Sequence, residues 1–178
     1  MEFIYASSTS LALDSIVQPG NYGENVSAHR PGVTDGWVLA REMIFENVRL
    51  RIAPQQPSRL RANFLFTSTA AALALKKDLE NGILASRLYR VELIDDTMPF
   101  CFADYDALRQ IVSSDFCGST LQAAMAYWIG TTKDIGPWSD RAHEFLTYSP
   151  IKILRQVSGG NPFELHCPTI SVTQGIGD

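Results

Sequence analysis

The sequence predicts an α+β fold, in which helices flank a small mixed or antiparallel sheet. Two observations support this prediction. Runs rich in β-forming residues are separated by helical patterns through most of the chain, and two such runs follow each other directly near its end. The 178 residues contain no internal repeat, low-complexity tract or linker, so we expect one domain over residues 1–178.

In the first third of the chain, the β-formers Phe3, Ile4 and Tyr5 predict a strand over residues 2–7. Residues 9–16 suggest a short helix, and the prolines and glycines after them indicate a loop to about residue 36. An amphipathic helix should follow to residue 52, with Asp35 as its cap. Spacings of three and four place its inward residues at Trp37, Ile44, Val48 and Ile52.

The remaining elements follow from local patterns. Apolar and aromatic residues predict a buried strand over 62–66, and the alanines after it predict a helix over 69–79. Alternation predicts a strand over 88–94. Short helices should begin at Asp104 and at Ser119 or Thr120, the second with Leu121, Met125 and Trp128 inward. Late strands are expected over 145–148, 151–157 and 169–172.

Composition excludes some classes of protein. A net charge of −4 gives no global basic field for nucleic acid or anionic membrane, although a local patch is still possible. The three cysteines Cys101, Cys117 and Cys167 have neither disulfide-framework nor zinc-site spacing, which favours reduced thiols in a cytoplasmic chain. His143 and His166 do not complete a metal site with Cys167. We expect no signal peptide and no membrane-spanning helix.

Three segments carry the functional interpretation. Residues 59–74 (RLRANFLFTSTAAALA) form a strand that ends in hydroxyls and leads into a helix, residues 87–94 (RLYRVELI) form another strand, and residues 144–148 (EFLTY) place a carboxylate before strand residues. In this order they resemble the ADP-ribosyltransferase fold, and with scattered further residues they resemble an uncharacterised bacterial family of that superfamily. The resemblance implies a split sheet with flanking helices.

The resemblance also implies an activity: cleavage of NAD and transfer of ADP-ribose to a protein or nucleic-acid acceptor, as in a bacterial or phage toxin or effector. It implies that Glu144 is catalytic and stabilises the ribosyl cation. A second group of residues would bind the cofactor: Ser7 with Thr67 or Ser68 at the nicotinamide ribose, Tyr5 or Tyr89 near the nicotinamide, and Arg59 at the phosphates.

One departure from the family favours a different function. Many members carry His or Arg on the first strand, where this chain has Tyr5, and a phenol donates a hydrogen bond without carrying charge. The alternative is a catalytically inactive binding module on the same fold that recognises a partner protein or a nucleotide. A structural or assembly protein with an incidental cleft is a third possibility.

The candidate residues also have purely structural interpretations. A glutamate such as Glu144 at a strand end is usually exposed. Thr67 and Ser68 have the positions of residues that cap a following helix. Arg59 can cover apolar surface with its aliphatic stem. Aromatic residues at helical spacing, such as 127–128, are typical of a core.

Overall fold

The computed structural model describes residues 2–28, 36–70, 72, 87–129 and 143–157. Its strands are β1 (Glu2–Ser7), β2 (Ile16–Val17), β3 (Asn63–Leu65), β4 (Arg87–Leu93), β5 (Phe100–Asp104), β6 (His143–Thr147) and β7 (Ile151–Val157). Its α-helices are α1 (Asn21–Ser27), α2 (Trp37–Ile52) and α4 (Phe116–Ile129), and two 3₁₀ helices, Tyr105–Gln110 and Ser113–Asp115, precede α4.

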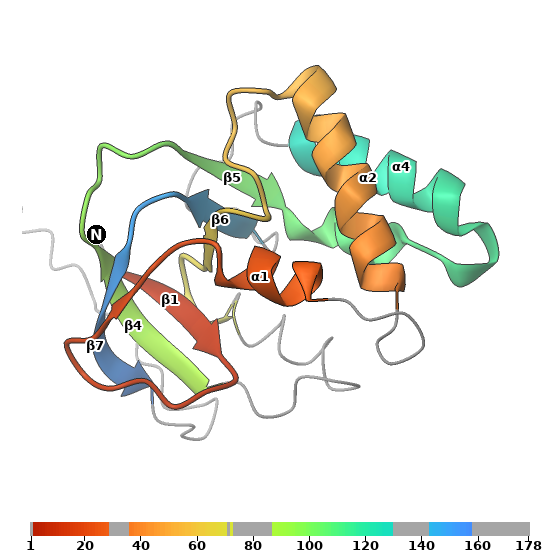
Figure 1. The fold of residues 1–178 in the computed structure, drawn as a ribbon. Coiled ribbons are helices and arrows are strands. Elements are labelled where there is room, and N and C mark those ends of the chain that lie inside the picture. Colours follow the sequence, from red (N-terminus) through yellow and green to blue (C-terminus); the bar gives the residue numbers. More distant parts are fainter. Residues whose placement is uncertain (1, 29–35, 71, 73–86, 130–142, 158–178) are drawn as a thin grey trace, which may run out of the picture.

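The strands form two antiparallel sheets, which confirms the predicted α+β class. One sheet has the order β1-β4-β7-β2 and the other has the order β3-β6-β5. An isolated bridge joins them, because Ile4 in β1 exchanges two backbone hydrogen bonds of 2.8 Å with Phe66, just after β3. The helices α2 and α4 pack against each other on the side of the molecule that carries β5 (Figure 1).

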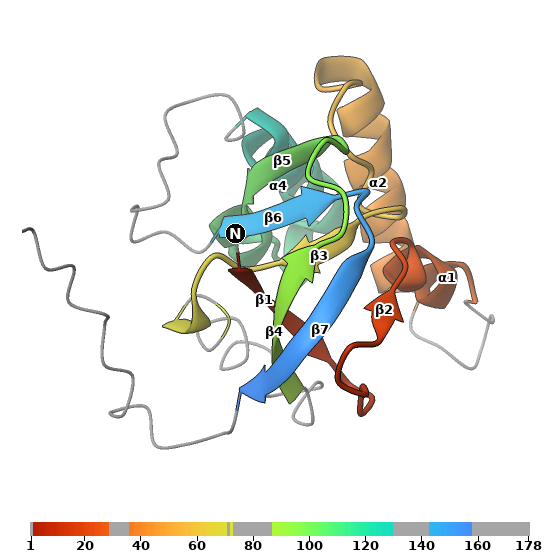
Figure 2. The ribbon, with the colours of Figure 1, turned by 90° about the vertical axis from the view of Figure 1, so that its left-hand side faces the viewer.

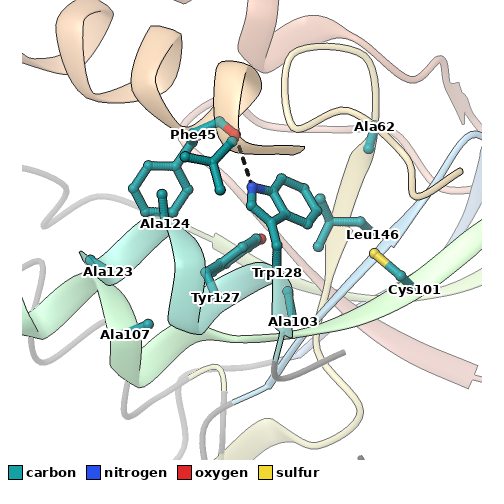
Figure 3. Packing of buried hydrophobic residues seen from close by; sticks show 11 residues of the cluster. Phe45, Ala62, Cys101, Ala103, Ala107, Ala123, Ala124, Tyr127, Trp128 and Leu146 are labelled. Atoms are coloured by element: carbon teal, nitrogen blue, oxygen red, sulfur yellow. Dashed lines mark hydrogen bonds between the residues drawn. The ribbon is translucent and has the colours of Figure 1, made fainter. Parts of the chain in front are cut away.

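A first core cluster fills the space between these two helices and the smaller sheet. The fully buried side chains of Phe45, Tyr127, Trp128 and Leu146 meet there (Figure 3). The Trp128 indole Nε1 donates to the Phe45 carbonyl oxygen at 2.9 Å, so the polar edge of this buried ring has a partner. The helices are therefore fixed to β6, the strand that carries Glu144.

A second cluster joins the two sheets. Phe3 of β1 stacks on Phe145 of β6 with ring centroids 4.4 Å apart, and Leu65, Tyr89 and Ile153 pack around them. Figure 2 shows the short strands β5 and β6 running at an angle to β7. These apolar contacts hold the two sheets together, so that the polar end of β1 lies close to the polar end of β3.

The helix over residues 37–52 is confirmed, but its predicted inner face is partly wrong. Phe45 and Val48 are buried as the periodicity requires, and so are the charged residues Glu42 and Arg49. Trp37 and Ile52, expected to face inward, are 37% and 46% exposed. In α4 the small residues and Tyr127–Trp128 face inward, whereas Leu121 and Met125 are exposed.

The segment between β1 and α2 differs most from the prediction. Instead of a helix over 9–16, a turn leads into β2, which pairs with β7. The segment expected to be a loop contains α1, and Gly23 lies within this helix. Glycine is needed there for packing and not for a turn, since a Cβ would lie 1.9 Å from the Leu60 carbonyl oxygen. The strand β5 was not predicted either.

Other expectations were met or fall on residues that are not described. Asp104 caps the first 3₁₀ helix, since its side chain accepts from the Asp106 amide at 2.9 Å. Asp35, most of the helix over 69–79, and the strand over 169–172 lie outside the described residues. Within the described part of the chain, no helix has the length and apolar character needed to cross a bilayer.

Candidate functional site

A cavity of about 690 Å³ opens where the end of β1 meets α1, β3 and the first 3₁₀ helix. This volume is in the range of small-molecule and nucleotide sites. Its described lining combines hydroxyls, amides, aromatic rings and charges: Tyr5, Ala6, Ser7, Ser8, Thr9, Asn21, Tyr22, Asn25, Arg41, Arg59, Ala62, Asn63, Phe64, Phe66, Tyr105, Leu108, Arg109 and Glu144. The cavity therefore joins segments that are far apart in the sequence.

Arg59 lies at the centre of a buried network of charges. Its Nε donates to Glu42 Oε2 at 2.9 Å, and its Nη1 donates to Glu144 Oε2 at 2.6 Å. The same Nη1 donates to the Tyr127 hydroxyl at 2.5 Å, and that hydroxyl donates to Glu144 Oε2 at 2.8 Å. One guanidinium thus fixes two carboxylates that come from α2 and β6.

Aromatic rings surround the same guanidinium. The Arg59 Cζ lies 4.8 Å from the ring centroids of Phe64 and Tyr127, 5.6 Å from that of Phe45 and 5.9 Å from that of Tyr22. Burial by itself would lower the pKa of Arg59, but the Glu42 and Glu144 carboxylates raise that pKa well above its ordinary value. Arg59 is therefore a permanent cation, and its charge is already paired.

Glu144 lines the cavity, and one of its two carboxylate oxygens accepts no hydrogen bond from the described residues. Its side chain is almost fully buried, with the residue 4% exposed, and it lines the cavity. Both hydrogen bonds that it accepts from the described residues, from Arg59 and Tyr127, reach Oε2, and none reaches Oε1. The carboxylate is thus held at one oxygen, while the other can accept a hydrogen bond from a ligand.

Glu42 links this pair to the wall of the cavity. Its Oε1 accepts from the Tyr22 hydroxyl at 2.9 Å and from Arg41 Nε and Nη2 at 3.0 and 2.9 Å. Burial would raise the pKa of Glu42, but the charges of Arg59 and Arg41 outweigh it and lower the pKa below its ordinary value. Glu42 is therefore ionised, although the residue is only 1% exposed.

A wall of hydroxyls continues from the end of β1. The Oγ of Ser7 and the Oγ1 of Thr9 lie 3.1 Å apart, and the Thr9 amide donates to Ser7 Oγ at 3.2 Å. Tyr5 lies two residues before Ser7 and lines the same cavity. Burial raises the pKa of the Tyr5 phenol, and a polar contact with Asn21 offsets part of that rise. Tyr5 is therefore a neutral donor at neutral pH.

The structure brings four of the seven sequence-predicted site residues together. Tyr5, Ser7, Arg59 and Glu144 line one cavity. The other three, Thr67, Ser68 and Tyr89, are not among its described lining residues.

Tyr89 lies in the core between the sheets. It is fully buried, and its hydroxyl accepts from the Leu11 amide at 3.0 Å. Thr67 and Ser68 follow the bridge that ends β3, and Ser68 accepts a backbone hydrogen bond from Ala72 at 3.2 Å through its carbonyl oxygen. A backbone bond of this kind is typical of the start of a helix.

The site also contains Glu42, Arg41 and Tyr22, which the sequence did not identify as site residues. One signal was available, because Glu42 and Arg49 fall on the same helical stripe as Phe45 and Val48. A charge in an apolar stripe indicates a buried partner. The buried cation that pairs with Glu42 is Arg59, 17 residues away, and local spacing does not reveal such a pairing.

The described residues contain no group of three or more His, Cys, Asp and Glu side chains placed to hold a metal ion. Cys101 is buried and Cys117 is exposed, and neither lines the cavity. His166 and Cys167 lie outside the described residues.

Comparison with known proteins gives a family without an assigned activity. A search of curated proteins found no match. Residues 24–159, which include α2, Arg59, β4 and Glu144, match a family described as "Protein of unknown function (DUF2441)". Because the match covers most of the chain, the protein belongs to this family.

Proposed function

We propose that the protein is an ADP-ribosyltransferase, which cleaves NAD in this cavity and passes ADP-ribose to a protein or nucleic-acid acceptor. One observation carries the proposal: the carboxylate of Glu144 has an unpartnered oxygen, among the described residues, in a cavity that it shares with the polar end of β1. The order of these segments resembles that fold, and the shared cavity supports the roles that the resemblance implies for Glu144, Tyr5 and Ser7.

The proposed reaction needs a carboxylate more than it needs an acid. The bond between the ribose C1′ and the nicotinamide nitrogen breaks, and nicotinamide leaves with the electron pair and becomes neutral. Positive charge then develops on the ribose, as it does in glycoside cleavage. The acceptor nucleophile bonds to C1′ and loses its proton. Glu144 Oε1 would accept a hydrogen bond from a ribose hydroxyl and offset the developing charge.

Arg59 acts in this proposal on the carboxylate and not on the substrate phosphates. It holds Glu144 Oε2 at 2.6 Å and is itself held by Glu42, so the carboxylate is oriented before substrate binds. A fixed group need not reorganise as charge develops, and this preorganisation is the main source of electrostatic catalysis. Tyr5 and Ser7 would donate to the nicotinamide amide and the ribose.

A second candidate function, a binding module without catalysis, is favoured by a specific observation. The charge of Glu144 is already matched by Arg59, and a paired carboxylate offsets developing positive charge less than an unpaired one does. Tyr5 on the first strand also lacks the charge that many members of the resembled family carry there. In this case the cavity would bind a nucleotide or a partner and leave it unchanged.

Two measurements on the wild-type chain separate these functions. Nicotinamide release from NAD reports cleavage, and calorimetric titration with NAD reports binding. We expect both signals, with release increasing when a cell lysate supplies the acceptor. Binding without release would support the binding module, and the absence of both signals would contradict the proposed function.

A further inference from the structure

Among the described residues, three guanidinium groups border the cavity, and they differ in how completely carboxylates neutralise their charge. Arg59 is buried between Glu42 and Glu144. Arg109 forms an ion pair with Asp106 three residues earlier, in the same 3₁₀ helix. Arg41 shares the carboxylate of Glu42 with Arg59, so that one negative charge is divided between two cations.

Arg41 also has donors to spare. Its Nε and Nη2 donate to Glu42 Oε1, and Nη2 also donates to the Tyr22 hydroxyl at 3.0 Å. Among the described residues Nη1 has no hydrogen-bond acceptor, and the side chain is 21% exposed. The guanidinium is thus fixed along one edge while its other end is available, which is the arrangement that suits it to bind phosphate.

The surroundings of Arg41 favour an anion. Asn21 and Asn25 of α1 line the same cavity and carry amide donors. Of the described lining residues, Glu144 is the one carboxylate, and it is separated from Arg41 by the chain of ion pairs through Glu42 and Arg59. The cavity therefore has a carboxylate at one end of this chain and a partly unused cation at the other.

We propose that Arg41 is the phosphate-binding residue of the cavity and that a bound nucleotide lies with a phosphate at Arg41 and a ribose at Glu144. This rests on the proposed function for the identity of the ligand as a nucleotide, but it does not require cleavage. It assigns to Arg41 the role that the sequence suggested for Arg59, because Arg59 already forms ion pairs with two carboxylates.

Titration of the protein with ADP and with adenosine tests the assignment, because the two ligands differ in their phosphates. We expect the wild type to bind ADP more tightly than adenosine. A charge-assisted hydrogen bond corresponds to about a tenfold to hundredfold change in affinity. Arg41→Gln should therefore weaken ADP about tenfold or more and leave the affinity for adenosine within about twofold, and the preference for ADP should decrease with salt.

Arg51→Gln is the matched control, since it removes the same charge from an exposed position of α2 that does not line the cavity, and it should leave both affinities unchanged. If Arg41→Gln does not fold, Arg41→Lys serves as a second variant. It keeps the positive charge but loses the planar guanidinium that can donate two hydrogen bonds to a phosphate, and it should reduce the preference for ADP.

Two results would overturn the assignment: an undiminished preference for ADP in a folded Arg41 variant, or no preference for ADP in the wild type. Binding of ADP through Arg41 without nicotinamide release from NAD would support this assignment and contradict the proposed transferase activity.

Discussion

Replacing Arg59 by Met tests whether the buried network holds the cavity together. The substitution keeps an unbranched apolar stem among the surrounding rings and removes the cation. Glu42 retains Arg41 and Tyr22 as partners, whereas Glu144 retains Tyr127 alone. Glu144 therefore becomes a buried carboxylate without a counter-charge.

The expected loss of stability follows from the contacts of Arg59. Two hydrogen bonds to carboxylates, at 2.9 and 2.6 Å, contribute about 2 kcal/mol each. Their sum agrees with the cost of about 3–5 kcal/mol for removing one partner from a buried ion pair. A loss of about 4 kcal/mol lowers the Tm of a chain of this length by about 8–16 °C.

A double variant shows whether the loss comes from the unpaired charge. Arg59→Met with Glu144→Gln removes both charges, so we expect it to be more stable than the sum of the two single losses predicts, by about 1–3 kcal/mol. Urea unfolding of the four proteins gives this coupling energy. Arg61→Met, at an exposed position two residues away, should change stability by no more than about 0.5 kcal/mol.

The stabilising role of Arg59 would be contradicted by an Arg59→Met protein with wild-type stability, or by single losses that simply add. Either result would mean that the ion pair between Arg59 and Glu144 does not stabilise the fold.

Three further predictions concern acid, packing and thiol chemistry. Because the folded-state pKa of Glu42 is lowered, its contribution to stability is present above its unfolded pKa and lost as the pH falls through the folded one. The urea concentration at the unfolding midpoint should therefore decrease as the pH is lowered below about 5. The decrease should be less steep in Glu42→Gln than in the wild type, and equal slopes would contradict this. Gly23→Ala should lower the free energy of thermal unfolding by about 1–3 kcal/mol, because the added Cβ would lie 1.9 Å from the Leu60 carbonyl oxygen. An unchanged Tm would contradict the close packing of α1 against Leu60. Burial raises the pKa of Cys101 to about 12, so iodoacetamide at pH 8 should modify the exposed Cys117 and leave Cys101 unmodified until urea is added, as peptide mass spectrometry can show.

The parts of the fold that sequence predicts well are those with a clear local period. The strand over 2–7, the helix over 37–52 and the late strands at 145–148 and 151–157 were each identified to within two residues. In these segments, local propensity and tertiary packing favour the same structure.

The failures have a different cause. Gly23 resembles a turn residue by type, but it is required because α1 approaches the Leu60 backbone, a contact that only the tertiary structure creates. The exposure of Trp37 and Ile52 has a similar origin, since buried charges occupy part of the inner face of α2. Packing between distant segments decided these positions, and local pattern does not contain that information.

The candidate site shows the same limit. Sequence order identified Glu144 and Arg59 as separate candidates, 85 residues apart, but did not predict that they form an ion pair. A glutamate at a strand end is usually exposed, whereas the Glu144 carboxylate is nearly buried and held at one oxygen. In Glu144→Gln, a moderate loss of stability should therefore accompany any loss of activity.

The rate of nicotinamide release from NAD by wild type and Glu144→Gln shows whether the Glu144 carboxylate supports NAD cleavage. Gln keeps the shape and one acceptor oxygen but loses the charge, so the rate should fall by about a hundredfold or more, while NAD binding falls less. Glu92→Gln, an exposed change on β4 outside the cavity lining, should match the wild type. Melting curves define a temperature at which all three proteins are folded. Release by the wild type and Glu92→Gln but not by Glu144→Gln is the predicted result, and equal rates in all three, or no release by the wild type, would contradict it.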